Sequence, residues 1–313
     1  MSFAPPVFNV NENPRKWRNY LESEGYVVLT DILNSEQYSD LLETFQREFT
    51  QVSPRFSFTD SETWTIANTP AMFGKGMAIY NGFGQSDFMW KLRTNSNIQS
   101  PFKTLFNTEE LVTSLDGFSV FVSDKQKSKS WLHIDENPKN DIFSIQGAYN
   151  MFPVNSGDAG FVVVPGSHKT FKPETPHKKD WIVVDQETFL PQAVKLLIPE
   201  NSFTLWNSRL IHANTGMVKI KHKKGATRTP PTRINRITAY VTFLPKETRS
   251  EKIKDARIET YKDGKTTSHW SNRCEVKTYP YGFKKRYESR GFNTLEPRLT
   301  ETGDIPPERA CLL

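Results

Sequence analysis

The sequence has few cysteines and no long apolar run. Nothing in its 313 residues approaches the roughly 20 apolar residues that span a bilayer, and residues 1–20 have no apolar signal core. The two cysteines, Cys274 and Cys311, do not make a disulfide framework, and no internal repeat is evident. We therefore expect a cytoplasmic protein in a reducing compartment, without a membrane span, a disulfide scaffold or a repeat architecture.

The chain is rich in aromatic residues and has a mild positive charge. Aromatic content is 12%, with 22 Phe and 7 Trp, so the chain is not disordered overall. Its length allows a large core, and we expect one main domain with additional segments attached to it. The formal net charge is +6. Such a charge indicates solubility unless it is concentrated in one place, in which case it indicates an anionic partner.

Helical patterns dominate the first part of the chain. Asn13-Pro14 opens a short helix that Gly25 ends, and Asn34 with Gln37 forms a capping box at the start of a second helix. We expect residues 1–115 to be a helical and irregular region that packs on the core. The expected elements here are helices at 13–24, 34–49 and 100–115 and a strand at 26–33.

From Asp116 onward the apolar residues repeat every two positions instead. Turn residues such as Pro165-Gly166-Ser167 separate the repeats. Many short strands after a helical part predict a β-barrel or sandwich backed by helices. We expect residues 116–246 to form this core and residues 247–313 to be a C-terminal extension that partly wraps it. The expected strands are 118–122, 131–135, 142–152, 160–164, 193–197, 202–212 and 233–243.

One of these strands carries a candidate metal motif. Successive side chains of a strand alternate faces, so His133 and Asp135 point the same way. With His212 from a second strand they would give two imidazoles and one carboxylate, with three coordination positions open. That set suits Fe(II) oxygenase chemistry better than structural zinc. A His-x-Asp triplet alone is a weak signal, and the alternative for His212 is a core histidine.

The motifs around this triplet occur in a recognisable order. They are His133-x-Asp135, then Gly160 to His168 with its Pro-Gly-Ser-His turn, then Trp206 to His212, then Arg236. This order resembles the phytanoyl-CoA dioxygenase-like branch of the Fe(II)/2-oxoglutarate oxygenases, over roughly residues 20–245. The resemblance implies a mainly β fold with flanking helices, whose core is a double-stranded β-helix, the cupin-like jelly roll. It also implies iron at His133, Asp135 and His212, with 2-oxoglutarate as co-substrate.

Binding of 2-oxoglutarate needs a second group besides the metal. The co-substrate would chelate iron at its keto-acid end and present a carboxylate at the other, which calls for a buried arginine. Arg236 is the first candidate because it opens a strand whose alternate residues are polar; Arg233 is the alternative. Asn214, on the face of His212, would hydrogen-bond the co-substrate. In the family this arginine follows the distal histidine closely, whereas here residues 217–232 are inserted between them.

This inserted loop concentrates basic charge. It holds five Lys or Arg and no acidic residue. Either it is a solvated loop, or it captures an anionic substrate such as a phosphorylated metabolite, a CoA thioester or a nucleic acid strand. No interleaved aromatic residue supports a platform for stacking bases.

We therefore expect a non-haem Fe(II)/2-oxoglutarate-dependent dioxygenase. It would hydroxylate a small-molecule substrate, anionic if the basic loop recruits it, with release of succinate and CO2. The resemblance favours hydroxylation because Asp135 fills a position that related halogenases leave to a small residue. The alternatives are a dioxygenase acting on a nucleic acid or a protein side chain, a cupin-like hydrolase or isomerase, and a metal-free binding barrel. His168 is expected to cap its turn, and His177, His222 and His269 to be solvated.

Overall fold

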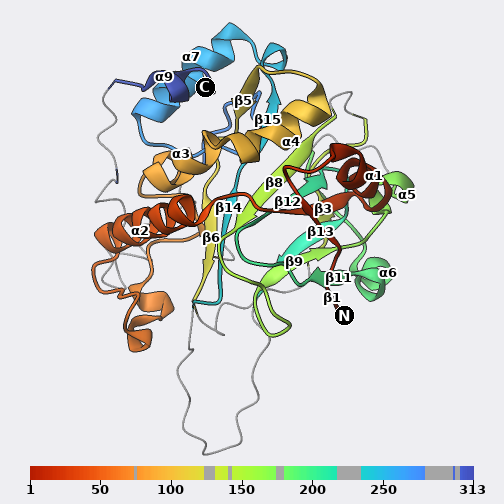
Figure 1. Ribbon diagram of the computed structural model, residues 1–313, viewed down its shortest axis with the longest axis horizontal. Helices are drawn as coiled ribbons and strands as arrows, with labels where there is room; N and C mark the ends of the chain where they lie inside the picture. Colours follow the sequence, from red (N-terminus) through yellow and green to blue (C-terminus); the bar gives the residue numbers. More distant parts are fainter. Residues whose placement is uncertain are drawn as a thin grey trace, which may run out of the picture.

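Two large β-sheets, a two-stranded sheet and a set of helices make up the computed structural model of the chain (Figure 1). It describes residues 1–73, 76–122, 131–139, 143–173, 180–216, 234–278, 299 and 304–313. The basic loop at 217–232, Arg233, His177 and His222 lie outside the described residues.

The larger sheet has seven strands in the order β2-β3-β12-β8-β14-β6-β4. All neighbours are antiparallel except β2 and β3. The first 115 residues supply three of these strands. The strands are β2 (Val7–Asn9), β3 (Tyr26–Thr30), β4 (Met77–Ala78), β6 (Phe118–Phe121), β8 (Ile145–Asn150), β12 (Ser202–Asn207) and β14 (Arg236–Tyr240).

The smaller sheet has six strands in the order β1-β11-β9-β13-β7-β10. Its only parallel pair among the described strands is β1 with β11. The strands are β1 (Ser2–Phe3), β7 (His133–Ile134), β9 (Gly160–Val163), β10 (Ile182–Val183), β11 (Val194–Leu196) and β13 (His212–Thr215). A separate pair joins β5 (Leu111–Thr113) to β15 (Phe243–Pro245).

The two sheets pack face to face. Trp206 and Tyr240 of the larger sheet share one apolar cluster with Phe161 and Leu196 of the smaller one. Burial of apolar area at roughly 25 cal/mol per Å² makes such a shared face the main force that holds two sheets together. The predicted fold class, mainly β with flanking helices and a jelly-roll core, is confirmed.

Helices cover the outer face of the larger sheet (Figure 1). Phe45 of α2 packs against Phe118 of β6 with ring centroids 5.4 Å apart, and Phe102 of α4 lies 6.1 Å from Phe203 of β12. None of the helices in the described ranges is both long and apolar enough to cross a membrane. The helices are α1 (Pro14–Glu24), α2 (Ser35–Val52), α3 (Asp87–Arg93), α4 (Ser96–Phe106), α5 (Ser167–Thr170), α6 (Gln186–Phe189), α7 (Glu251–Lys262) and α9 (Pro307–Ala310).

The first two helices begin where the sequence predicts, and the first also ends there, whereas α2 runs three residues further than expected, to Val52. The Asn13 side chain accepts from the Arg15 N–H, and Gly25 ends α1 in the left-handed region at φ 83°. Asn34 and Gln37 form the reciprocal bonds of the capping box at 2.9 and 3.1 Å. Each cap satisfies backbone N–H groups that the first helical turn leaves unpaired.

The predicted helix at 100–115 is wrong in its bounds. Helix α4 starts at Ser96, where the Asn95 side chain accepts from the first-turn N–H groups. It ends at Phe106 because Asn107 adopts the left-handed conformation at φ 51°. Residues Leu111–Thr113 then form β5.

The predicted strand at 202–212 is two strands in different sheets. The chain turns after Asn207, whose carbonyl accepts from the Leu210 N–H at 2.8 Å and whose side chain accepts from the Arg209 N–H at 2.9 Å. Strand β12 therefore ends in the larger sheet and β13 begins in the smaller one. Because the sheets face each other, Trp206 on β12 and His212 on β13 still point into the same interior.

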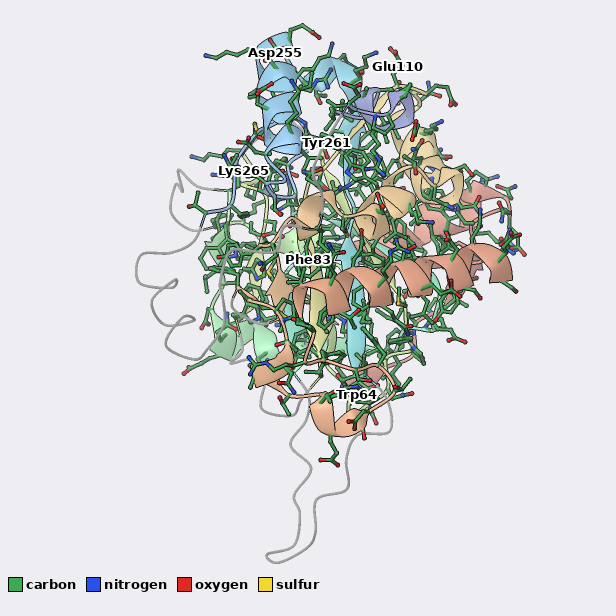
Figure 2. The ribbon with its side chains drawn as sticks, turned by 90° about the vertical axis from the view of Figure 1, so that its left-hand side faces the viewer. Trp64, Phe83, Glu110, Asp255, Tyr261 and Lys265 are labelled. Carbon is green, nitrogen blue, oxygen red and sulfur yellow. The ribbon has the colours of Figure 1, made fainter. Side chains whose placement is uncertain are left out.

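The C-terminal extension packs on the core through α7. In Figure 2, Asp255 and Tyr261 mark α7 at one end of the molecule, and Trp64 lies near the opposite end. The Arg257 guanidinium is fully buried and donates to the carbonyl of Leu313 at 2.9 Å. The Thr113 N–H of β5 donates to the Leu312 carbonyl at 3.0 Å.

Candidate metal centre

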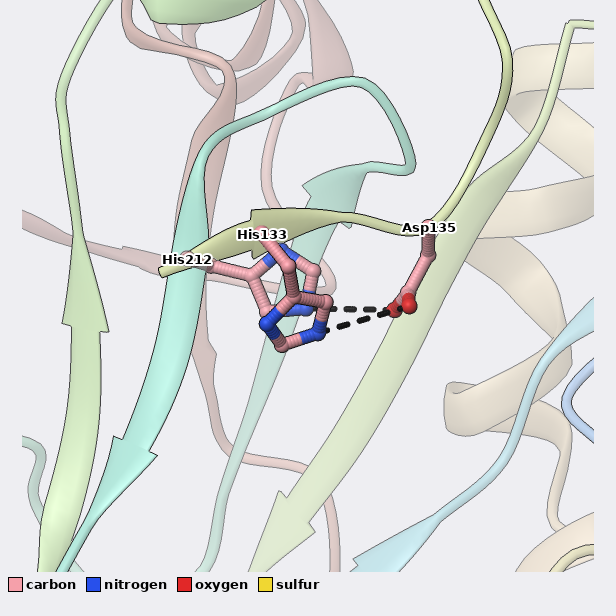
Figure 3. A group of neighbouring side chains, drawn as sticks. All are labelled: His133, Asp135 and His212. Atoms are coloured by element: carbon pink, nitrogen blue, oxygen red, sulfur yellow. Dashed lines mark ion pairs between the residues drawn. The ribbon is translucent and has the colours of Figure 1, made fainter. Parts of the chain in front are cut away.

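His133 and His212 lie opposite each other on adjacent strands. Strand β13 pairs with β7 so that His212 is the register partner of His133, and the ring centroids are 4.4 Å apart. Asp135 follows β7 directly. Its carboxylate oxygens lie 3.4 Å from His133 Nε2 and 3.2 Å from His212 Nε2 (Figure 3). One donor atom from each of the three residues lies within 4.8 Å of the others.

Backbone carbonyls orient the two imidazoles. His133 Nδ1 is 2.9 Å from the Trp131 carbonyl oxygen, and His212 Nδ1 is 2.9 Å from the Leu210 carbonyl oxygen. A carbonyl only accepts, so this contact favours a proton on Nδ1 in both rings. The lone pair is then on Nε2, the atom that faces Asp135, as in metal-binding histidines held by a second hydrogen bond.

Asp135 is held by its neighbours as well. Gln146 on β8 donates from Nε2 to Asp135 Oδ2 at 3.0 Å and lies 3.3 Å from Ser208 Oγ. The backbone N–H of Asp135 donates to the Ser208 carbonyl at 2.9 Å. These bonds fix the carboxylate with the Nε2 atoms on one side of it.

Burial and mutual charge set the protonation of the site. Burial by itself would raise the pKa of Asp135, but the adjacent imidazoles of His133 and His212 outweigh it and hold that pKa well below its usual range. Burial lowers the pKa of His133, although Asp135 opposes this. The carboxylate is therefore ionised at neutral pH, and burial disfavours the charged form of His133, the protonation states that a metal requires.

A buried arginine contacts a polar residue on the strand of His212. The Asn214 side chain, two residues beyond His212 on β13, donates to the Tyr240 hydroxyl at 3.1 Å and accepts from Arg236 Nη1 at 2.8 Å. Arg236 crosses from β14 in the facing sheet and is 2% exposed. Its Nε has no partner, and no carboxylate among the described residues pairs with it. Burial lowers the pKa of Arg236, and the nearby Tyr240 hydroxyl opposes the shift.

The triad lines a cavity of about 860 Å³. This volume is near the upper end of the roughly 300–1,000 Å³ typical of small-molecule sites. Trp131 stacks on His133 with ring centroids 4.5 Å apart, so an aromatic wall reaches the metal ligands. The aromatic residues in the wall include Tyr80, Trp131, Phe161, Trp181, Trp206 and Trp270.

The residues singled out in the sequence are brought together here. His133, Asp135, His212 and Asn214 all line the cavity, and Arg236 contacts Asn214 behind it. His168 is not part of the site; its Nε2 lies 3.0 Å from the Glu22 carbonyl oxygen. His269 is not solvated as predicted but half-buried in the cavity wall, where the segment closed by the Thr267–Val276 bridge places it.

Sequence reasoning missed three other side chains of the cavity. Gln146 and Trp206 lie on strands that were predicted, on the inward faces that alternation defines, so the parity of β8 and β12 was a usable signal. Asp116 stands just before β6, at the boundary that the change of periodicity marked. Its inward position depends on the pairing of distant segments, for which the local sequence has no signal.

Comparison with known structures places the fold in one class. The chain is similar to a non-haem α-ketoglutarate-dependent carbocyclase of nogalamycin biosynthesis, SnoK, with a TM-score of 0.52 and 12% identity over 77% of this chain and 87% of that one. It is similar to EctD from S. alaskensis, solved with bound Fe, with a TM-score of 0.50 and 14% identity over 76% and 78%. At these identities the likeness establishes the fold, which is the one that the resemblance in the sequence implies.

Among curated proteins, the chain is similar to the Ava biosynthesis cluster protein O of Aspergillus versicolor. The two are 26% identical over 167 residues, which is 52% of this chain and 54% of the relative. The match therefore spans about half the length of that relative. No protein-family model matches the chain.

Proposed function

We propose that the chain is a non-haem Fe(II)/2-oxoglutarate-dependent dioxygenase that hydroxylates a small molecule. The observation that carries the proposal is the conjunction of two features in one interior. One is the buried set of two Nε2 atoms and a carboxylate, and the other is the buried guanidinium of Arg236, which has no counter-ion among the described residues.

The donor set fits ferrous iron. His133 and His212 offer neutral imidazole nitrogens and Asp135 an ionised oxygen, all on one side of the enclosed space. Two histidines and one carboxylate leave positions open, which is typical of non-haem Fe(II) oxygenases. When bound there, iron with 2-oxoglutarate and O2 supplies the oxidising chemistry, with succinate and CO2 as co-products.

The chain's own residues fit the co-substrate. Arg236 presents a permanent positive charge that no described carboxylate neutralises, and a planar guanidinium matches a carboxylate in two parallel hydrogen bonds. Asn214 accepts a hydrogen bond from that guanidinium and lies two residues beyond His212 on β13. The indole Nε1 of Trp206 is also buried without a partner in the cavity wall. A bound dicarboxylate would satisfy donors that are otherwise costly to bury.

The cavity fits a small molecule as prime substrate. Its aromatic wall would hold a C–H bond near the open side of the triad and exclude water from it. The proteins of similar fold include a carbocyclase, so the same site chemistry has more than one outcome. We propose hydroxylation because Asp135 occupies the carboxylate position. The preference for an anionic substrate stays a prediction, since the basic loop at 217–232 is outside the described residues.

The test is a screen for succinate formation with Fe(II), 2-oxoglutarate and O2 across pools of metabolites, CoA thioesters, peptides and nucleic acids. A metabolite should stimulate succinate formation, and its product should gain one oxygen atom from labelled O2. His212→Ala should abolish both signals. A product without labelled oxygen would indicate cyclisation or epimerisation instead of hydroxylation. Undiminished turnover by His212→Ala would contradict the proposed site.

A further inference from the structure

A second polar feature of the cavity has no part in holding metal or co-substrate. Asp116 stands before β6 and is 6% exposed, yet it lines the cavity. Its Oδ1 accepts from the Gly117 N–H at 2.8 Å. Within the described parts of the chain, no residue donates to Oδ2 and no cation forms an ion pair with this carboxylate. Burial raises the pKa of Asp116, although Lys277, His269 and Arg93 oppose the shift.

The C-terminal extension builds the wall beside Asp116. The Thr267 N–H donates to the Leu115 carbonyl at 2.9 Å, and Thr267 bridges to Val276 in antiparallel fashion. This hairpin brings His269 and Trp270 into the cavity wall. The Nε2 atom of His269 is buried and has no partner. One wall of the cavity thus holds a buried ring nitrogen without a partner, on His269, and a carboxylate oxygen to which no described residue donates, on Asp116. Most buried polar groups in folded proteins are hydrogen-bonded, so a ligand or water is the expected partner here.

The other charged groups in the wall largely neutralise one another. Arg273 pairs with Asp180 at 2.6 Å and lies 3.4 Å from Glu275. Lys277 lies on the exposed rim. The buried charge left over, apart from Asp135 in the triad, is the carboxylate of Asp116, which does not favour a second anion in this part of the cavity.

Three indole rings line the same cavity. Trp131 lies on His133, and Trp181 stands at the rim with its ring centroid 5.7 Å from that of His133 and half of its surface exposed. The Arg273 guanidinium carbon lies over the Trp270 ring, 4.3 Å from the ring centroid. Rings of this kind bind flat apolar groups by stacking and cations by their negative faces.

We propose that Asp116 is a substrate-binding residue that accepts a hydrogen bond from a hydroxyl or amino group on a ring-bearing substrate whose ring system lies against the indoles of the cavity. This assignment rests on the proposed function and narrows its substrate class. His269 lies on the same wall and would contact the same polar group. The substrate's donor would satisfy Oδ2, and its ring system would lie over Trp131 toward the metal ligands.

The test uses probes that share one ring system and differ in one polar group. These are 2-naphthylmethylamine, 2-naphthylmethanol and 2-naphthoate. Their dissociation constants are measured by calorimetry on the full chain, with and without added Mn2+ and 2-oxoglutarate. The variant Asp116→Asn keeps an acceptor for the Gly117 N–H and replaces the free oxygen by an NH2 group. Asp180→Asn is the matched control, because Asp180 lines the same cavity but is already paired with Arg273.

The amine or the alcohol should bind at least about tenfold more tightly than the naphthoate, as expected for one hydrogen bond to a charged group. Asp116→Asn should remove that preference, and Asp180→Asn should keep it. A preference for the naphthoate, an unchanged ranking in Asp116→Asn, or no binding of the amine and the alcohol would each overturn the assignment. If a variant fails to fold, the order of the three dissociation constants in the wild-type chain still tests the assignment. Mn2+ and 2-oxoglutarate affinities, measured alongside, report separately on the proposed function.

Discussion

Replacement of Arg236 by leucine should separate co-substrate binding from folding. The guanidinium is 2% exposed, and its one described hydrogen bond is to Asn214 Oδ1 at 2.8 Å. Removing one member of a buried charge pair costs about 3–5 kcal/mol. If the second member is the distal carboxylate of 2-oxoglutarate, Arg236→Leu weakens its binding by roughly two to three and a half orders of magnitude.

The same substitution should not destabilise the ligand-free protein. Arg236→Leu removes a buried charge that has no counter-ion, and the one acceptor it leaves, Asn214 Oδ1, belongs to a half-buried side chain that lines the cavity, where water can replace the lost donor. The free energy of unfolding without 2-oxoglutarate should therefore stay the same or rise. Arg93 is the matched contrast, because it is equally buried but donates to the carbonyls of Gly84 and Asp116 at 2.7 Å each. Arg93→Leu leaves both acceptors unpaired and should lower the free energy of unfolding by about 1–3 kcal/mol for each.

The assay is calorimetric titration of 2-oxoglutarate into protein loaded with Mn2+ in place of iron, together with denaturant unfolding of the ligand-free protein. The reasoning fails if Arg236→Leu binds 2-oxoglutarate with wild-type affinity. It also fails if Arg236→Leu loses as much stability as Arg93→Leu, because Arg236 would then be a structural residue.

Three further substitutions test other parts of the site and fold. Gln146→Leu removes the donor to Asp135 Oδ2 and should weaken metal binding about 10- to 100-fold in a metal titration, with near-wild-type affinity counting against the orienting role. Trp206→Phe keeps an aromatic ring but removes an unpaired N–H, so 2-oxoglutarate affinity should fall about tenfold in the same calorimetric titration. Gly147→Ala would place a Cβ 2.3 Å from Phe203 Cζ on the neighbouring strand. It should lower the free energy of unfolding by about 1–3 kcal/mol in urea, and an unchanged midpoint would mean that β8 and β12 are less tightly packed.

The sequence predicts the metal ligands because their placement is mostly local. Alternation along a strand puts His133 and Asp135 on one side whatever the rest of the chain does. His212 still faces the same interior as Trp206, as the alternation predicts, even though a turn after Asn207 divides the single predicted strand into two. The wrong bounds of the predicted strand therefore do not change the predicted orientation of His212. Arg236 is inward for the same reason, since β14 begins with it.

The other wall of the cavity depends on long-range pairing. His269 lies in a polar stretch that has no periodicity, and only the pairing of Thr267 with Leu115 and Val276 turns it inward. Asp116 is buried by the same contact. Local composition favours exposure for both residues, and tertiary packing overrides it. Residues of the metal centre were thus accessible to sequence reasoning, whereas residues that select a substrate were not.

Metal content tests the central claim most directly. The full chain, purified without air, would be loaded with Fe(II), desalted and analysed for iron beside Asp135→Ala and His133→Ala. Asp135 and His133 both line the cavity, so both variants should fold, which circular dichroism checks. The account predicts one ferrous ion per wild-type chain and almost none in either variant. A wild-type chain that retains no iron, or a folded Asp135→Ala chain that retains a full equivalent, would contradict it.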